Sequence, residues 1–142
     1  MAHIAILGLG NWGTAVARMW LLDGHKVKGW TIEQEVYESV VMDGINRKYL
    51  PDHSIEGLEA TMRIDEALDG VEIVVLAIPS SVILDVVDDI IPHLRPGHVL
   101  IDLAKGLAPG KRLISQAIHE KLKAAQKTNP LAVVTGPTLS LI

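Results

Sequence analysis

The chain has 142 residues, a length typical of one folded domain, and 49% of them are hydrophobic. Its net charge of −4 gives no basic surface for nucleic acid, and its lack of cysteine excludes a disulfide framework and a thiolate metal site. The longest apolar runs are strand-sized, and no charged segment leads into a signal sequence. We therefore expect a cytoplasmic protein with no membrane or nucleic-acid partner. Its six histidines are scattered, and we expect no metal site.

A glycine-rich turn near the start of the chain lies between a predicted strand and a predicted helix. Ile4 to Leu7 is a short apolar run typical of a buried parallel strand, and Thr14 to Leu22 has a strong helical pattern. Between them, Gly8 permits a sharp turn, Gly10 lets the backbone approach a pyrophosphate, and Gly13 lets the helix pack closely on the strand. A glycine-rich turn alone is a weak signal. Its position between strand and helix predicts nucleotide binding, with the N–H groups of the helix start facing the phosphates.

A second strand is expected at Lys26 to Trp30, and an acidic residue near its end would bind the adenine ribose. Glu33 lies about twenty residues beyond Gly13, which is the spacing expected for that role. An equally good explanation places Glu33 in the first turn of the next helix, where a carboxylate suits the helix dipole. Residues 31–33 contain no Lys or Arg for a 2′-phosphate, and Lys28 lies mid-strand, where its side chain need not face the ribose. We therefore expect NAD to be preferred over NADP.

The rest of the chain alternates helices and strands. We expect strands at 59–62, 71–78, 98–103 and 131–135, of which the first has the weakest signal, and helices at 34–45, 65–68, 79–91 and 111–125. About six strands in this order predict an α/β fold, a Rossmann-like, doubly wound, mostly parallel sheet with right-handed crossovers. Three carboxylates share the helix at 79–91, but their spacing favours a solvated face over a metal site: Asp85, Asp88 and Asp89.

Five motifs occur in a fixed order along almost the whole chain. They are Gly8-Leu-Gly-Asn-Trp-Gly-Thr-Ala15, Asn46-Arg-Lys-Tyr-Leu-Pro51, Ala77-Ile-Pro-Ser80, Ala104-Lys-Gly-Leu107 and Gly136-Pro-Thr138. In order and spacing the chain resembles NAD(P)-dependent glycerol-3-phosphate dehydrogenase over residues 3 to 138. The resemblance implies a cytoplasmic enzyme that reduces dihydroxyacetone phosphate to sn-glycerol 3-phosphate, the backbone of phospholipids.

The resemblance also implies the residues of the site. Lys105, which follows the C-terminal end of a predicted strand, would be the catalytic residue of this chain and would polarise the ketone or pair with phosphate. Elsewhere a lysine is usually a solvated surface charge. Substrate would contact Lys105, Gly136 and Thr138. For Trp12, the alternative is a core position in the first helix. The cofactor, NAD or NADP, would contact Gly8, Gly10, Asn11, Trp12, Gly13, Ile32, Glu33, Tyr49, Pro79, Val82, Lys105 and Ser140.

Two departures from the family pattern shape the interpretation. Many bacterial relatives that use NADP place Arg or His where this chain has Ile32, which again favours NAD. The family also continues after Gly136-Pro-Thr138 into a helical domain that carries a proton-donating lysine and phosphate-binding groups, whereas these 142 residues stop at Ile142. We therefore interpret residues 1–142 as one dinucleotide-binding domain that binds cofactor and lacks most of the catalytic site.

Two alternatives remain open, and one further partner is expected. The chain could be a non-catalytic nucleotide-binding module, or the cofactor domain of another two-domain dehydrogenase such as a ketopantoate or hydroxyacid reductase. The loop from Asn46 to Pro51 and the Lys105-Gly106 pair count against the second alternative. Apolar surface expected near residues 136–142 would support a homodimer.

Overall fold

The computed structural model describes residues 1–103, 107–108, 112–135 and 138–141. A seven-stranded sheet forms its centre, in the order β3–β2–β1–β4–β5–β8–β9. The first six strands along this order run parallel, and β9 pairs antiparallel with β8. The strands are β1 His3–Leu7, β2 Lys26–Trp30, β3 Glu59–Thr61, β4 Ile73–Leu76, β5 Val99–Asp102, β8 Leu131–Thr135 and β9 Thr138–Leu141.

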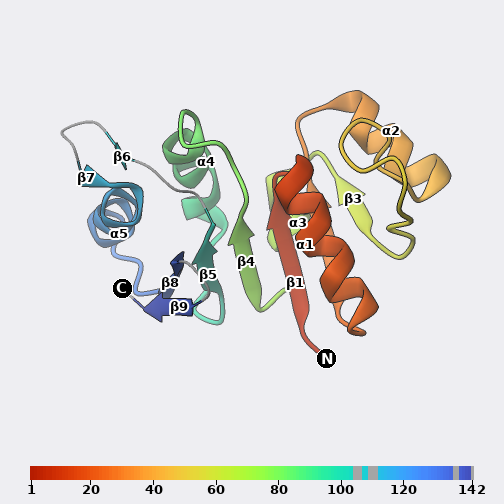
Figure 1. The fold of residues 1–142 in the computed structure, drawn as a ribbon. Helices are drawn as coiled ribbons and strands as arrows, with labels where there is room; N and C mark the ends of the chain where they lie inside the picture. The colour runs from red at the N-terminus through yellow and green to blue at the C-terminus, as the bar shows by residue number, and fades with distance from the viewer. Residues whose placement is uncertain (104–106, 109–111, 136–137, 142) are drawn as a thin grey trace.

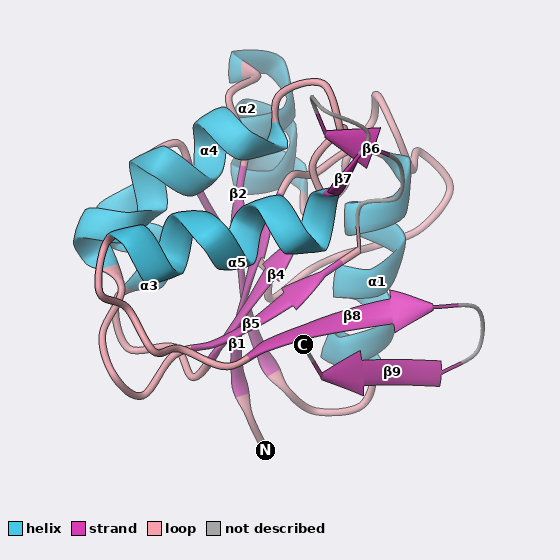
Figure 2. Cartoon of the chain, turned by 90° about the vertical axis from the view of Figure 1, so that its left-hand side faces the viewer, coloured by secondary structure: helices cyan, strands magenta, loops and turns pink. Residues whose placement is uncertain are grey.

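Helices cover both faces of this sheet (Figure 1 and Figure 2). They are α1 Asn11–Leu22, α2 Gln34–Asp43, α3 Ile64–Leu68, α4 Ile83–Ile90, the 3₁₀ turn η1 Ile91–His93 and α5 Ile114–Ala124. Buried residues of α1 and α2 belong to one hydrophobic cluster, and those of α3, α4 and α5 belong to the other. The predicted Rossmann-like, doubly wound α/β fold is therefore confirmed, with the parallel strands in the order 3-2-1-4-5-6.

The central strand β1 explains why the N-terminal apolar run is continuous. Ile4 and Ile6 lie in the cluster with α1 and α2, whereas Ala5 and Leu7 lie in the cluster with α3, α4 and α5. Successive side chains of a strand point to opposite faces, so a strand covered on both faces is apolar at every position. The chain order of the strands reverses between β1 and β4. In open α/β sheets, ligands bind outside the carboxyl ends of the strands at this point.

Several predicted boundaries were wrong, and local geometry explains them. The helix predicted at 34–45 ends at Asp43, because Gly44 takes a left-handed conformation (φ 65°) and donates its N–H to the carbonyl of Val40 at 3.0 Å. The helix predicted to open at Pro79 begins at Ile83, because the Pro79 carbonyl accepts the N–H groups of Val82 and Ile83 in a turn. The strand predicted at 71–78 is shorter, since only Ile73–Leu76 pairs with β1 and β5 together.

The C-terminal part of the chain contains strands that the sequence pattern did not predict. A two-stranded hairpin pairs β6, Leu107–Ala108, with β7, Arg112–Leu113. The helix predicted from residue 111 therefore begins at Ile114. Strand β9 was not predicted either, and the apolar face expected at 136–142 involves side chains outside the described residues. No helix within the described ranges is long and apolar enough to cross a membrane.

Candidate nucleotide-binding site

The turn between β1 and α1 needs two of its glycines for its own geometry. Gly8 has φ +110°, and a Cβ there would lie 2.2 Å from the carbonyl oxygen of Ala77 in the chain beyond β4. A Cβ at Gly13 would lie 1.9 Å from the carbonyl oxygen of Gly8. Both distances are far below a van der Waals contact, so the close packing of α1 on β1 and β4 excludes any side chain at these positions.

Gly10 differs from Gly8 and Gly13 because nothing in the described part of the chain requires it to be glycine. Its φ and ψ of −78° and −165° suit any residue, and a Cβ there would have no atom of the described residues within 4 Å. It is the N-cap of α1, which has no side-chain cap hydrogen bond and no acidic residue in its first turn. The N-terminus of α1 thus combines open space with a partial positive charge, which fits a phosphate group approaching the backbone.

An open pocket of about 660 Å³ lies over this turn, outside the carboxyl ends of β1, β2 and β4. The structure brings ten of the predicted cofactor residues into its wall, and whether they contact a cofactor stays a prediction. These residues are Gly8, Gly10, Asn11, Trp12, Gly13, Ile32, Glu33, Tyr49, Pro79 and Val82.

Apolar side chains stand exposed in the wall of this pocket. Trp12 is 64% exposed, so the alternative that placed it in the core of the first helix is wrong. Ile32 and Val82 also line the pocket and are exposed. Sequence reasoning did not single out Leu103, which follows β5 and lines the pocket as well. Exposed apolar groups around a concave site are typical of a surface that a ligand or another domain covers.

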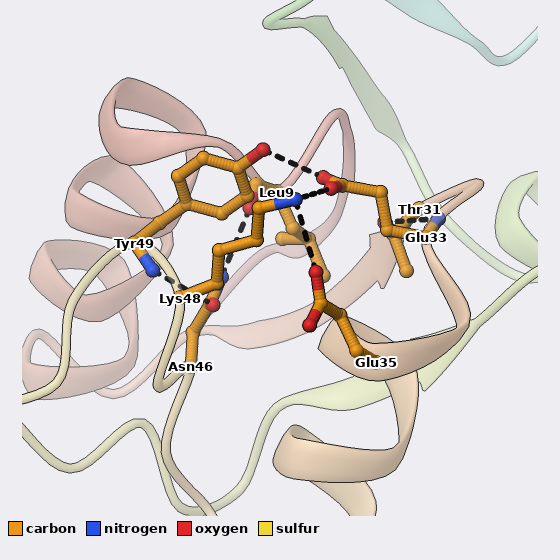
Figure 3. A network of polar contacts seen from close by, with 7 residues as sticks. All are labelled: Leu9, Thr31, Glu33, Glu35, Asn46, Lys48 and Tyr49. Atoms are coloured by element: carbon orange, nitrogen blue, oxygen red, sulfur yellow. Dashed lines mark hydrogen bonds and ion pairs between the residues drawn. The ribbon is translucent and has the colours of Figure 1, made fainter.

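Glu33 lies in the pocket wall and forms the centre of a polar network (Figure 3). Its Oε1 accepts a hydrogen bond from the ammonium of Lys48, and its Oε2 accepts one from the hydroxyl of Tyr49 at 2.8 Å. Lys48 also pairs with Glu35 at 3.0 Å, and the backbone N–H of Glu33 donates to Thr31 Oγ1 at 3.0 Å. Glu33 is the N-cap of α2, but its carboxylate makes no cap hydrogen bond there. The carboxylate therefore faces Lys48 and Tyr49 and not the N-terminus of α2.

These contacts shift the ionisation of all three partners. The hydrogen bond from Lys48, followed by that from Tyr49, lowers the pKa of Glu33. The same carboxylate raises the pKa of Tyr49, and Glu33 together with Glu35 raises the pKa of Lys48. At neutral pH the network therefore holds a carboxylate anion beside an ammonium cation. Sequence reasoning did not foresee the role of Lys48, although Lys48 lies within one of the quoted motifs.

Asn46 connects the same loop to the glycine turn (Figure 3). It is fully buried, and its Nδ2 donates to the Leu9 carbonyl and to Thr14 Oγ1, both at 2.9 Å. Its Oδ1 accepts the backbone N–H of Tyr49 at 3.2 Å. The loop thus ties the turn at the start of α1 to the residue that binds the Glu33 carboxylate. Because every one of these groups is buried or half-buried, each bond satisfies a polar atom that would otherwise lose its solvent partner.

Two other cations near Glu33 in sequence, Lys28 and Arg47, have partners of their own. Lys28 donates to the carbonyls of Glu66 at 3.1 Å and Asp69 at 2.7 Å, near the end of α3. Arg47 pairs with Asp43 at 2.6 Å. Asp85, Asp88 and Asp89 are exposed, as expected, although Asp85 also lines the pocket and Asp88 pairs with Lys121. No group of three or more His, Asp or Glu in the described part of the chain is placed to hold a metal ion.

The remaining predicted site residues cannot be placed at the pocket. Lys105 and Gly136 lie outside the described residues. Thr138 and Ser140 belong to β9, whose side chains also lie outside what the structure describes. Their assigned roles stay predictions.

Comparison with known proteins agrees with this geometry. The family model for the N-terminus of NAD-dependent glycerol-3-phosphate dehydrogenase matches residues 3–140. Glycerol-3-phosphate dehydrogenase [NAD(P)+] of Coxiella burnetii is 33% identical over 138 residues, which are 96% of this chain and 40% of that protein. The enzyme of Corynebacterium urealyticum is 37% identical over an alignment of 143 positions, which covers 99% of this chain and 42% of that protein. The crystal structure of the Coxiella burnetii enzyme matches with a TM-score of 0.84 at 32% identity, over 96% of this chain and 41% of that one.

The sheet order, the glycine turn and the pocket define a Rossmann-type dinucleotide-binding domain of the dehydrogenase class. Within that class, the chain belongs to the family of NAD-dependent glycerol-3-phosphate dehydrogenase N-terminal domains. It spans about 40% of the length of the curated relatives it matches. The resemblance inferred from the five sequence motifs is thereby confirmed.

Proposed function

We propose that the pocket over the β1–α1 turn binds NAD. The pyrophosphate lies over Gly10 and the N-terminus of α1, and the carboxylate of Glu33 accepts hydrogen bonds from the hydroxyls of the adenine ribose. The observation that carries this proposal is the open space at Gly10. A Cβ there would touch no atom of the described residues, so the glycine leaves room for a group that this part of the chain does not supply.

A dianionic 2′-phosphate is disfavoured at the ribose end of this pocket, which supports NAD over NADP. Glu33, Glu35 and Lys48 together carry a net charge of −1, and Glu33 lines the pocket. A ribose 2′-hydroxyl donates to such a carboxylate, whereas a 2′-phosphate is repelled by it.

We further propose that the chain is the cofactor domain of an enzyme that reduces dihydroxyacetone phosphate to sn-glycerol 3-phosphate in glycerophospholipid synthesis. This proposal rests on family membership and on the names of the relatives. Bound NADH supplies the hydride. The proposed role of Lys105 is to polarise the ketone, and Gly136 and Thr138 contact the substrate. The proposed role of Lys105 is supported by its place in the sequence, three residues after the end of β5, because ligands of open α/β sheets bind outside the carboxyl ends of the strands.

Calorimetric titration with NADH tests cofactor binding directly. Folded wild-type protein should bind NADH, and Gly10→Val should abolish binding because its side chain occupies the space of the phosphates. Gly97→Val is a matched control, since a Cβ at Gly97 also has no neighbour within 4 Å among the described residues and Gly97 is not among those that line the pocket. Equal NADH binding by the wild type and Gly10→Val would show that the cofactor does not lie over this turn.

A separate assay tests catalysis. We expect the 142-residue chain alone to give no detectable NADH oxidation with dihydroxyacetone phosphate, because general acid–base help is worth roughly two to four powers of ten in rate and a solvent-open site loses positioning as well. Adding the helical domain of a full-length relative should restore turnover. If NADH binds but turnover never appears, a non-catalytic nucleotide-binding module becomes the better description. Robust turnover by this chain alone would show that its catalytic groups lie elsewhere.

A further inference from the structure

Lys48 contacts Glu33 in the wall of the pocket but does not line the pocket itself (Figure 3). Its ammonium contacts Glu33, which lines the pocket, and Glu35, which does not. The centroid of the Tyr49 ring lies 5.4 Å from the nitrogen of the same ammonium. The side chain of Lys48 is 43% exposed, so it is open to solvent as well as to these partners. Of the two carboxylates that hold this cation, only that of Glu33 belongs to a residue in the pocket wall.

Other cations close in sequence are held away from this end of the pocket. Lys28 is bonded to two backbone carbonyls near the end of α3, and Arg47 is paired with Asp43. Within the described part of the chain, Glu33 forms its ion pair with Lys48. Without its charge, the side chain of Glu33 would hold Lys48 less strongly, and a shift of roughly 3 Å, the length of a hydrogen bond, would bring the ammonium beside that side chain at the pocket wall.

We propose that the Glu33–Lys48 pair, rather than Glu33 alone, sets the choice between NADH and NADPH. While Glu33 is ionised, it keeps Lys48 occupied and presents a carboxylate to the ribose hydroxyls. When the charge of Glu33 is removed, Lys48 becomes the cation that grips a 2′-phosphate. The inference rests on the proposed cofactor site, and it makes Lys48 a residue that determines specificity without lining the pocket.

Charge and donor number support this exchange. With Glu33 neutral, Glu35 and Lys48 sum to zero, so the local repulsion of a phosphate dianion is removed. An ammonium has three N–H donors, and its contact with Glu35 uses one of them, which leaves two for phosphate oxygens. A flexible four-carbon stem lets a lysine reach a phosphate as a point charge.

Equilibrium titration with NADH and NADPH at one fixed, moderate salt concentration tests the proposal. Glu33→Gln should tighten NADPH binding on the order of tenfold, the strength of a charge-assisted hydrogen bond, and should weaken NADH binding. Adding Lys48→Met to Glu33→Gln should abolish this gain, and adding Lys48→Arg should retain it. Thermal unfolding followed by circular dichroism shows that each variant is folded.

Glu35→Gln is the matched control. It removes the same charge and another contact of Lys48, but Glu35 does not line the pocket, so the ratio of NADPH to NADH affinity should change much less than in Glu33→Gln. Equal NADPH affinity in Glu33→Gln with and without Lys48→Met would overturn the role of Lys48. An equal response of Glu35→Gln and Glu33→Gln would reduce the effect to net charge and overturn it too. Folded wild-type protein that binds neither dinucleotide would instead remove the proposed function on which the inference rests.

Discussion

Gly10 and Gly13 lie three positions apart at the start of α1, and replacement by alanine should affect a different property of the protein at each site. A Cβ at Gly13 would lie 1.9 Å from the Gly8 carbonyl oxygen and 3.2 Å from the Ala77 Cβ. A Cβ at Gly10 would have no neighbour within 4 Å in the part of the chain that the structure describes. Gly13→Ala should therefore lower stability, whereas Gly10→Ala should lower cofactor affinity and leave stability nearly unchanged.

The expected magnitudes follow from these distances. At Gly13 the obstructing atom is backbone, so the chain must shift, and overpacking of this kind costs about 1–3 kcal/mol or more. For a chain of this length that lowers Tm by roughly 3 °C per kcal/mol, or about 3–10 °C. At Gly10, the lower entropy of the unfolded chain stabilises by about 0.4–1 kcal/mol, and the loss of a favourable N-cap residue costs a similar amount. The two offset, so Tm should stay within roughly 3 °C of the wild type.

Two measurements on the same samples decide the matter. Thermal unfolding followed by circular dichroism gives Tm, and titration with NADH gives affinity. Gly10→Ala should weaken NADH binding by about tenfold, the loss of one charge-assisted hydrogen bond from the backbone. Wild-type stability in Gly13→Ala would refute the close packing of α1 on the turn. Wild-type affinity in Gly10→Ala would refute the approach of a pyrophosphate to this backbone.

Three further predictions concern the polar contacts. Asn46→Ala should destabilise the fold by about 2–4 kcal/mol in urea unfolding, because two buried acceptor groups and one backbone donor lose their partner. The pKa of Glu33 is lowered in the folded state, so the contribution of its pair with Lys48 is complete above the ordinary carboxyl value of 4.5 and is lost as the pH falls through the lower folded value. A carboxyl NMR titration should place the Glu33 midpoint below 4.5, and Lys48→Met should raise it. Lys121→Ala should change stability by less than about 1 kcal/mol, since its pair with Asp88 is solvent-exposed; a larger loss would show that the pair supports the packing of α4 on α5.

The central strands and the first helix could be predicted from the sequence because burial on both faces leaves a clear pattern. Lys26–Trp30 and Leu131–Thr135 agree with the predicted strands residue for residue. The short strand near residue 60, which had the weakest signal, is also present as Glu59–Thr61. The two-residue strands β6 and β7 are too short to show any periodicity, so no pattern in the sequence could reveal them. The end of α2 at Asp43 could have been predicted from the sequence, because glycine, here Gly44, is a typical residue at the C-terminal end of a helix.

The part of the site that the backbone forms, the glycine turn, could be predicted from the sequence. Gly8, Gly10 and Gly13 follow from the order of strand, turn and helix, and their separate roles follow from spacing. The pairing of Lys48 with Glu33 could not be predicted, because it depends on the loop after α2 folding back onto the end of β2, fifteen residues earlier in the chain. From the sequence alone, Glu33 could either bind the adenine ribose or lie in the first turn of the next helix. The structure shows that its carboxylate bonds to Lys48 and Tyr49 of the loop instead of capping α2, and that Glu33 lines the pocket.

The loop that carries Asn46 and Lys48 is closed at its base. Ile55 donates its N–H to the Gly44 carbonyl at 2.7 Å, and Leu50 donates to the Asn46 carbonyl at 2.8 Å, whereas residues 51–54 are exposed. The entropy of closing a loop rises only slowly with its length, and the fixed ends do not depend on the residues between them. A peptide tag or fluorescent reporter inserted between Asp52 and His53 should therefore leave the pocket intact, which offers a place to attach a sensor of cofactor occupancy beside the ribose end of the site.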